Sequence, residues 1–367
     1  MHGSNLIKEL FRLDAEAHVR AWGGEKMQQA GATIIKSYTE LAFMGFAEVI
    51  KNLPTIFKNL RFCKEDILNY SPDVLVLIDY PGFNLRIAKW AKSAGIRVIY
   101  YISPQVWAWK ESRVTAIKQY VDKMLVILPF EKEFYGRWNY KVDYVGHPLV
   151  EVMEKEKKNA VVLLGERPII ALLPGSRKQE IRRKLPVMIE TASLFPEYDF
   201  IVARAPGLPD NYYDEFMGDY QNVRGVSNDT YNLLRQSKAA LVTSGTATLE
   251  TALLNVPEVV CYRANTLSYQ IGKRLIRIKY ISLVNLIMDK LVVTELIQKA
   301  FTTENLAREL NAILHDKATL QRILKDYRSL KELLSKGGHA SANAAKLIVD
   351  YLSSQQLNRN NNEGKKK

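Results

Sequence analysis

Short apolar runs alternate with longer amphipathic stretches along most of this 367-residue chain. From Ser71 onward, runs such as DVLVLID and RVIYYIS are each followed by a stretch with helical spacing, such as NLRIAKWAKSAG. Strands that alternate with helices are typical of a parallel sheet with helices on both faces. A polar segment, EVMEKEKKNAVVLLGERP, interrupts the alternation, which begins again at PIIALLPG. The sequence therefore predicts two Rossmann-like, doubly wound α/β domains that face a cleft.

The change of pattern along the chain gives the expected domain limits. We expect an N-terminal domain over residues 1–163 and a second domain over residues 164–335. After Ile281 the spacing becomes mostly helical. Residues 336–353 are predicted to form a C-terminal helix that packs back on the first domain. The polar residues 354–367 have the composition of a disordered tail.

Composition excludes several classes of protein. The longest apolar runs are far shorter than the ~20 residues that span a bilayer, and the first residues do not resemble a secretory signal. The two cysteines have no disulfide or metal-ligand spacing, which favours a reducing cytoplasm. The net charge of +13 suits phosphorylated substrates or an anionic membrane surface. Zinc-finger and RNA-binding motifs are lacking, so we expect no nucleic-acid partner. GxGxxG and P-loop motifs are also lacking, so no motif supports dinucleotide binding or a P-loop NTPase.

Two strand ends carry residues suited to chemistry, because ligands of open α/β sheets bind beyond the carboxyl ends of the strands. Asp79 follows the apolar run VLVLI, where partial desolvation raises a carboxyl pKa and suits it to general-base work. The alternative is a turn or capping aspartate. In ALLPGSRKQEI, Ser176 and Arg177 begin a helix after a glycine turn. Arg177 is suited to a bidentate contact with phosphate, and the alternative is a surface ion pair.

The stretch LVTSGTATLE repeats this design in the same half of the chain. It reads as a strand, a glycine turn and a helix whose first turn is crowded with Ser and Thr. Free N–H groups and the helix dipole make such a junction a site for an anion. Ser244, Gly245 and Thr246 form the turn, and Glu250 lies one turn into the helix. The alternative is that Ser244 or Thr246 only caps the helix.

Aromatic and histidine residues after other strands have structural explanations. Trp107 and Trp109 in SPQVWAW follow Ser103, and packing in the core or between domains accounts for them. His147 in YVGHPLV ends a strand near the linker, where a lone histidine is more often hydrogen-bonded structure than a catalyst.

An apolar stretch flanked by basic residues runs from Leu41 to Phe62. Its spacing is typical of a helix that lies in a membrane interface, and an ordinary core-facing helix is the alternative. The residues proposed to contact membrane or acyl chains are Phe43, Met44, Phe46, Ile50 and Phe57.

Together these fragments resemble the lipid-A-disaccharide synthase family, whose members are inverting glycosyltransferases of the GT-B fold. The matching motifs occur in the family's order: HGSNL, ELAFMGFAEVI, IDYPGFN, SPQVWAWKESR, LPFEKEFY, GHPL, LLPGSR, VTSGTATLETALLNVPEVVCYR and YISLVNLI. They cover most of the chain from residue 2 to about 300.

The resemblance implies a reaction and its site. UDP-2,3-diacylglucosamine would donate its sugar to 2,3-diacylglucosamine 1-phosphate, giving a β-1,6-linked disaccharide 1-phosphate and UDP. Ser176 and the turn Ser244–Gly245–Thr246 would bind the UDP-sugar, with Glu250 accepting hydrogen bonds from ribose hydroxyls. Arg177 would neutralise charge on the departing UDP. Asp79 would be the base for the acceptor 6-hydroxyl, and Asn285 and Glu295 would lie in segments that line the donor site.

The same resemblance implies the enzyme's surroundings. No D-x-D motif occurs, which agrees with an enzyme that uses neither a metal nor another cofactor. Because both substrates carry acyl chains, we expect a cytoplasmic protein bound peripherally to the inner face of the cytoplasmic membrane. A homodimer is compatible with the sequence.

Two departures from the family pattern matter. Many relatives carry a second aspartate where this chain has Gly82, so no role of that carboxylate transfers. Family members begin with a strand and a GEASGD loop before HG, whereas this chain starts inside that motif at Met1–His2. We therefore expect an upstream strand and loop. Without them the first domain would be poorly stable and catalysis weak, while the second domain would still fold and bind UDP.

Two other functions stay open at this stage. One is another UDP-sugar enzyme of the same architecture, either a murein-precursor glycosyltransferase or a UDP-sugar 2-epimerase. The other is a non-catalytic protein that binds UDP or lipid. A donor-specificity assay separates the enzymes from one another, and UDP binding without turnover would identify the binding protein.

Overall fold

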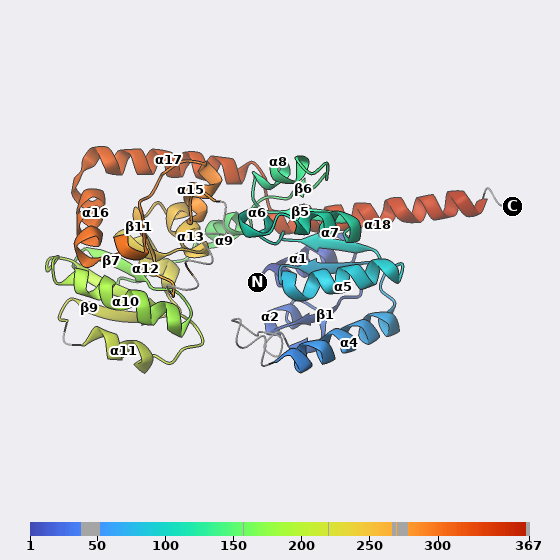
Figure 1. Ribbon diagram of the computed structural model, residues 1–367, viewed down its shortest axis with the longest axis horizontal. Coiled ribbons are helices and arrows are strands. Elements are labelled where there is room, and N and C mark those ends of the chain that lie inside the picture. Colours follow the sequence, from blue (N-terminus) through green and yellow to red (C-terminus); the bar gives the residue numbers. More distant parts are fainter. Residues whose placement is uncertain (38–51, 157, 219, 266–268, 270–277, 365–367) are drawn as a thin grey trace. The chain divides into compact units, whose positions relative to one another are not determined.

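The computed structural model describes residues 1–37, 52–156, 158–218, 220–265, 269 and 278–364. The chain divides into two units (Figure 1). Unit 1 consists of Met1–Val150 and Ser335–Lys367, and unit 2 consists of Glu151–Leu334.

The described residues of unit 2 form a six-stranded sheet in the order β12-β11-β10-β7-β8-β9. All of its neighbouring strands are parallel. The strands are β7 (Ile169–Leu173), β8 (Asp199–Arg204), β9 (Val223–Ser227), β10 (Ser237–Thr243), β11 (Glu258–Tyr262) and β12 (Glu295–Ile297). The predicted parallel sheet of the second half is therefore confirmed. β12 lies in a region that the sequence pattern predicts to be mostly helical. The strand has only three residues and lies at the edge of the sheet, which is too short a run to show in the pattern.

Helices of unit 2 follow the strands in the alternation that the sequence predicts. They are α10 (Lys178–Ala192), α11 (Asn211–Met217), α12 (Thr230–Gln236), α13 (Thr246–Leu253), α15 (Leu283–Met288), the short 3-10 helix η2 (Gln298–Ala300), α16 (Thr303–His315) and α17 (Lys317–Ser335). The central strand β7 is apolar on both faces. Ile169, Ala171 and Leu173 of β7 pack with Leu233 and Leu234 of α12 on one face. Burial of the whole of β7 explains why its sequence reads as a continuous apolar run.

Unit 1 is also an α/β structure with parallel strands. Its strands are β1 (Arg20–Gly23), β2 (Thr33–Ser37), β3 (Leu75–Ile78), β4 (Val98–Tyr101), β5 (Lys123–Val126) and β6 (Asp143–Tyr144). Its helices are α1 (His2–Leu13), α2 (Glu25–Gln28), α4 (Leu53–Tyr70), α5 (Pro81–Ser93), α6 (Val106–Trp109), α7 (Arg113–Tyr120), α8 (Glu131–Gly136), α9 (Pro148–Glu156), which extends into unit 2, and α18 (Ala340–Gly364).

The strands of unit 1 fall into two parallel sheets. β3, β4, β5 and β6 pair in that order, and β1 pairs with β2 alone. Each sheet has its own core. Ala21 and Ile34 pack with Ile7 of α1, whereas Ile99 and Leu125 pack with residues of α18. In the described residues no strand hydrogen-bonds to both β1 and β3. Helix α1 contributes to both cores, with Leu6 in the cluster of Ile99 and Ile7 in the cluster of Ala21.

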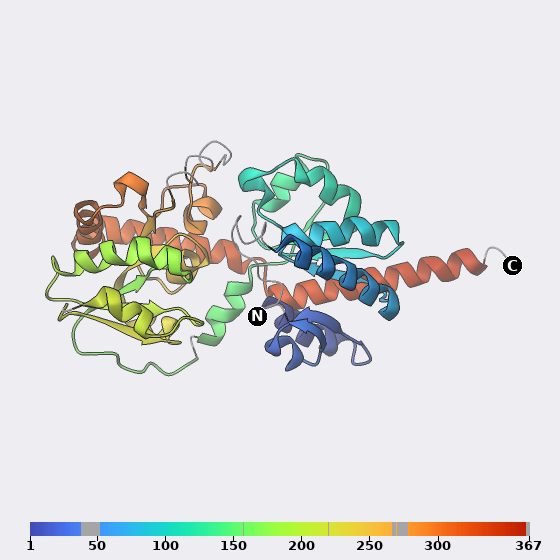
Figure 2. The ribbon, with the colours of Figure 1, turned by 60° about the horizontal axis from the view of Figure 1, so that its bottom comes forward.

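Helix α18 brings the C-terminal part of the chain into unit 1. It packs along α1, and Ala344 and Ile348 are buried against β4 and β5 (Figure 2). The helix continues through residues 354–364, the polar stretch that the sequence predicts as a tail. Extending an existing helix adds one hydrogen bond for each residue that is fixed, and this stretch contains neither proline nor glycine before Gly364.

The polar segment expected as a linker is held by unit 2. Arg235 of α12 donates to the carbonyls of Glu156 and Asn159 at 3.2 and 2.8 Å. Asn232 both accepts from the N–H of Val162 at 3.1 Å and donates to its carbonyl at 2.9 Å. These contacts explain why unit 1 ends at Val150. The sequence pattern predicts that the first domain ends later, at residue 163.

Among the described residues, no helix combines the length and the apolarity that a membrane span requires.

Candidate functional site

Two of the predicted loops lie at the same edge of the unit 2 sheet. β7 and β10 are neighbouring parallel strands, with Leu241 opposite Leu172, so Ser176–Arg177 and Ser244–Thr246 follow strand ends that lie side by side. Gly175 has φ +107°, and a Cβ there would lie 2.5 Å from Glu180 Oε2. Only glycine therefore fits this turn between β7 and α10 without strain.

Arg177 is exposed and already has an anionic neighbour. Its side chain is 61% exposed, and Nη1 donates to Glu180 Oε1 at 2.8 Å. The surface ion pair weighed as the alternative is thus present. Ser176 is exposed beside it. An exposed ion pair stabilises by less than about 1 kcal/mol, so the contact with Glu180 does not prevent the Arg177 guanidinium from binding a ligand.

The first turn of α13 has no side-chain cap. Its N-cap is Gly245, and no side chain hydrogen-bonds to the helix start. Ser244 Oγ instead donates to the carbonyl of Ile281 at 2.8 Å, and Thr246 is exposed. Ser244 and Thr246 therefore do not cap this helix. A Cβ at Gly245 would meet no atom within 4 Å, so the space in front of the helix dipole is open.

Glu250 lies one turn into α13 and is partly buried. It accepts a hydrogen bond from the hydroxyl of Tyr231 on α12 at 3.2 Å. Burial raises the pKa of Glu250, and the hydrogen bond from Tyr231 opposes that shift. The arrangement leaves carboxylate acceptor capacity for a further donor.

Asn285 and Glu295 are brought together by their side chains. Asn285 Nδ2 donates to Glu295 Oε1 and to the carbonyl of Val293, both at 2.9 Å, and Oδ1 accepts from the N–H groups of Val292 and Val293. An amide has four such bonds to make, so the Asn285 side chain is fully used. Glu295 also accepts from the N–H groups of Ile281 and Ser282.

These bonds connect the two segments with the β10–α13 loop. Ser244 is bonded to Ile281, and Ile281 is bonded to Glu295 on β12. All four hydrogen-bonding positions of the Asn285 side chain are occupied in this network. Asn285 can therefore position the segment but cannot hydrogen-bond to a ligand.

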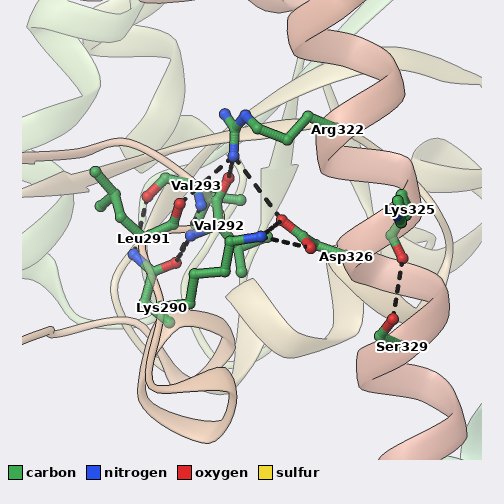
Figure 3. Close-up of polar contacts among 9 residues, drawn as sticks. Lys290, Leu291, Val292, Val293, Arg322, Lys325, Asp326 and Ser329 are labelled. Carbon is green, nitrogen blue, oxygen red and sulfur yellow. Dashed lines mark hydrogen bonds and ion pairs between the residues drawn. The ribbon is translucent and has the colours of Figure 1, made fainter.

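Helix α17 anchors the loop between α15 and β12 (Figure 3). Lys290 Nζ donates to the two carboxylate oxygens of Asp326 at 2.8 and 2.7 Å. Arg322 Nη1 donates to the carbonyl of Val292 at 3.0 Å and lies 4.0 Å from the Asp326 carboxylate. The loop whose N–H groups bond to Asn285 is thus fixed from a second side.

Lys184 is a residue that the sequence reasoning missed. It lies on α10, one turn beyond Glu180, is 2% exposed, and forms no hydrogen bond or ion pair with residues that the structure describes. Burial lowers its pKa to about 8, with the charges of Glu180 and Arg177 also acting on it. Thr243 Oγ1, at the end of β10, is likewise buried without a described partner. A lysine in the apolar spacing of Ile181, Leu185 and Met188 was the available signal.

Asp79 lies at the end of β3 in unit 1, as predicted. Asp79 and Tyr80 have φ +48° and +47°, and two successive non-glycine residues in this region store backbone strain. The hydroxyl of Tyr100 and the amide of Asn84 both donate to the Asp79 carbonyl. The side chain stays accessible to solvent, and desolvation raises its pKa, which confirms the predicted direction. The N-cap of α5 is Tyr80, so Asp79 does not cap that helix.

The other unit 1 candidates have structural roles. Trp107 is buried and its Nε1 donates to the buried Glu131 at 3.3 Å, whereas Trp109 is 48% exposed. Burial raises the pKa of Glu131 to about 7. His147 is buried, its Nδ1 accepts from the N–H of Leu149 at 3.2 Å, and burial lowers its pKa to about 4. A neutral, hydrogen-bonded histidine is what the structural explanation requires.

Of the five residues proposed to contact the membrane, one lies in the described part of the chain. Phe57 on α4 is 63% exposed. Phe43, Met44, Phe46 and Ile50 lie outside the described residues. Leu60, Cys63 and Ile67 of the same helix are buried, so α4 also has a core face.

Solved structures with a similar fold include sugar-processing enzymes. The kitacinnamycin glycotransferase matches with a TM-score of 0.66 at 14% identity over 95% of each chain. UDP-GlcNAc 2-epimerase from Neisseria meningitidis matches with a TM-score of 0.63 at 12% identity over 96% of each chain. Together with the calicheamicin glycosyltransferase CalG4, these neighbours show the GT-B fold. Identity this low shows the fold alone.

Sequence similarity, unlike the fold alone, identifies the family to which this chain belongs. The family model described as lipid-A-disaccharide synthetase matches residues 1–349. The lipid-A-disaccharide synthase of Nitrosococcus oceani is 38% identical over 98% of this chain and 95% of its own length. That of Geobacter metallireducens is 37% identical over 96% and 94%. This chain belongs to the lipid-A-disaccharide synthase family of glycosyltransferases, which act in lipid A biosynthesis.

Proposed function

We propose that this protein transfers the sugar of UDP-2,3-diacylglucosamine to the 6-hydroxyl of 2,3-diacylglucosamine 1-phosphate. The products are a β-1,6-linked disaccharide 1-phosphate and UDP. Family membership supports the reaction. The observation that carries the donor assignment is the uncapped first turn of α13, which opens beside the Gly175–Arg177 turn at neighbouring strand ends.

Unit 2 would bind the UDP part of the donor. The N–H groups of Gly245 and Thr246 offer donors to the diphosphate, and Arg177 offers a charge-assisted contact from the next loop. Glu250 has acceptor capacity for ribose hydroxyls, beside its bond to Tyr231. Lys184 adds a buried positive charge behind the Arg177 loop. Asn285 and Glu295 would shape the donor site by fixing residues 281–295.

Asp79 would act as the base. As its carboxylate accepts the proton of the acceptor 6-hydroxyl, the oxygen forms a bond to C1 of the donor sugar. The bond from C1 to the diphosphate oxygen breaks, and its electron pair leaves with UDP. The raised pKa of Asp79 supports this role, because a base works best when its pKa approaches the operating pH. Arg177 would stabilise the charge that develops on UDP.

We also propose peripheral binding to the inner face of the cytoplasmic membrane. Both substrates carry acyl chains, and the exposed Phe57 belongs to the amphipathic stretch suited to insert among lipids. Phe43, Met44, Phe46 and Ile50 would contribute to the same apolar face.

Calorimetric titration with UDP tests the donor site. Glu250→Ala and Arg177→Ala should each weaken binding by about 1.5–3 kcal/mol, the usual loss for a charge-assisted contact. Glu215→Ala and Arg182→Ala remove exposed charges from the same unit and serve as matched controls. Wild-type affinity in both site variants would overturn the assignment.

Turnover tests the base. Asp79→Asn should lower turnover by about 100-fold or more while leaving UDP affinity and melting temperature unchanged. The control is Asp73→Asn, because Asp73 is an exposed carboxylate at the opposite end of the same strand. Near-normal turnover of Asp79→Asn would make Asp79 a turn residue, and UDP binding by a wild-type chain that shows no turnover would favour the binding protein.

A further inference from the structure

A groove of about 540 Å³ on unit 1 is lined by cationic and aromatic side chains. It lies over three helices, and α5 lies between α4 and α7 (Figure 1). The residues that matter are Lys64 of α4, Arg86, Lys89, Trp90 and Lys92 of α5, and Tyr120 of α7. None of these residues takes part in the donor or acceptor chemistry proposed above.

Helical spacing explains the concentration of charge. Positions 86, 89, 90 and 93 are separated by three or four residues, so they share one face of α5. Lys64 Nζ lies 5.7 Å from the centre of the Trp90 ring, and Lys89 Nζ lies 6.0 Å from the centre of the Tyr120 ring. A ring face attracts an ammonium group without cancelling its charge.

Most of this charge is not neutralised. Lys92 is paired with Asp122, and the nearby Glu65 is paired with Arg61. Lys64, Arg86 and Lys89 form no ion pair with any residue that the structure describes. Arg86 Nη1 donates to the carbonyl of Gly82, a contact that leaves its charge in place. A groove with three cations that lack an acidic partner and two aromatic rings suits an anion such as a phosphate group.

Apolar residues beside the groove indicate the source of that phosphate. Phe57 and Leu68 of α4 are 63% and 57% exposed. Counted from Phe57, Lys64 and Leu68 are seven and eleven residues further along α4, so the three share one helical face. Large apolar side chains around cations are the pattern of a surface that enters the headgroup layer of a bilayer.

We propose that this groove binds the phosphate headgroups of anionic phospholipids. It would add an electrostatic contact with the bilayer beside the apolar stretch between Leu41 and Phe62, to which Phe57 belongs. The proposal deepens the membrane association inferred above and rests on it only for the kind of surface that is bound. It does not depend on the roles of Asp79, Arg177 or Glu250.

Vesicle sedimentation tests the groove. The full chain is mixed with vesicles of phosphatidylglycerol and phosphatidylcholine in equal parts, or of phosphatidylcholine alone, at low salt. Lys64→Gln, Arg86→Gln and Lys89→Gln together should weaken binding to the anionic vesicles about tenfold or more. The control carries Lys317→Gln, Lys325→Gln and Arg328→Gln, which remove three exposed cations from α17 of unit 2. The control should lose much less.

The outcomes separate the proposals. Turnover on detergent-dispersed substrates should be unchanged in the groove variant, so the groove and the catalytic assignment can fail independently. Selective loss on anionic vesicles, which disappears at high salt, would support the groove. Equal loss in both triple variants would reduce the effect to overall charge and overturn the proposal. Unchanged vesicle binding of the groove variant would also overturn the proposal. If that variant lost only its binding to an RNA oligonucleotide, the groove would be a nucleic-acid site instead.

Discussion

At the scale of single residues, Glu258 stands out as a buried acid whose side chain lacks hydrogen bonds to the described residues. It begins β11 and is fully buried, and neither carboxyl oxygen has a hydrogen-bond partner in the part of the chain that the structure describes. Burial raises its pKa well above the ordinary value of 4.5, and the nearby Glu295 raises it further. Tyr327 of α17 lies close to it and is also buried. Glu258 therefore enters the folded state as a neutral acid.

Glu258→Met should stabilise unit 2. Removing a buried carboxyl without partners and filling its space with an apolar side chain should add about 1–3 kcal/mol at neutral pH. The folded state holds the Glu258 proton more tightly than the unfolded state does. Wild-type stability therefore falls as the pH rises above about 4.5 toward the raised pKa. Thermal melting at several pH values should show a gain that is small near pH 4 and larger at pH 8.

Glu258→Gln provides the control for that measurement. It removes the ionisable proton but keeps a buried polar group, so it should flatten the pH dependence without the full gain in melting temperature. A Glu258→Met gain that is the same at pH 4 and pH 8 would contradict the buried acid.

At the scale of elements, the turn after β6 is held by close backbone contact. Gly146 has φ +96°, and a Cβ there would lie 2.6 Å from the carbonyl oxygen of Gly338. Asn343 of α18 donates to the carbonyls of Val145 and Gly337 at 3.0 and 2.7 Å. The turn is therefore the point where the returning C-terminal segment enters unit 1.

Gly146→Ala should destabilise unit 1 by about 2–4 kcal/mol, because it adds both left-handed strain and a backbone clash. Gly136→Ala is the matched control, since Gly136 ends α8 with open space around its Cα and no positive φ. Hydrogen exchange or limited proteolysis of unit 1 reports the loss. If both variants keep wild-type protection, the contact with Gly338 does not hold the turn.

Local pattern was sufficient to predict most elements and the positions of three candidate loops at strand ends. Each buried strand that precedes Asp79, Arg177 or Ser244 is continuous in sequence with its turn, so its position follows from spacing alone. Family resemblance named Asn285 and Glu295 only as residues of segments that line the donor site. The hydrogen bond between them was not predicted, because β12 is three residues long and its partners come from distant segments. The close approach of Gly146 to Gly338 depends on a tertiary contact that no local sequence pattern encodes.

At the scale of the whole molecule, the two units differ in how the chain builds them. Unit 2 is one continuous segment, Glu151–Leu334, whereas unit 1 needs residues from both parts of the chain. We expect the fragment Glu151–Leu334 to fold alone and to bind UDP within a few-fold of the full chain. Residues 1–150 alone should be poorly folded, because α18 covers the core of β3–β6. Circular dichroism and UDP titration of the two fragments check this, and an aggregated unit 2 fragment would contradict it.

Because α18 belongs to unit 1 but lies at the end of the chain, the two units complete their folding in a fixed order during synthesis on the ribosome. Residues 1–150 emerge first, but the helix that covers their sheet emerges only after all of unit 2 has been made. At about 5–20 residues per second, the apolar face that includes Ile99 and Leu125 stays uncovered for roughly ten seconds or more. Unit 2 therefore completes its fold before the half of the protein that is synthesised ahead of it. During that interval the nascent chain is a natural client for chaperones.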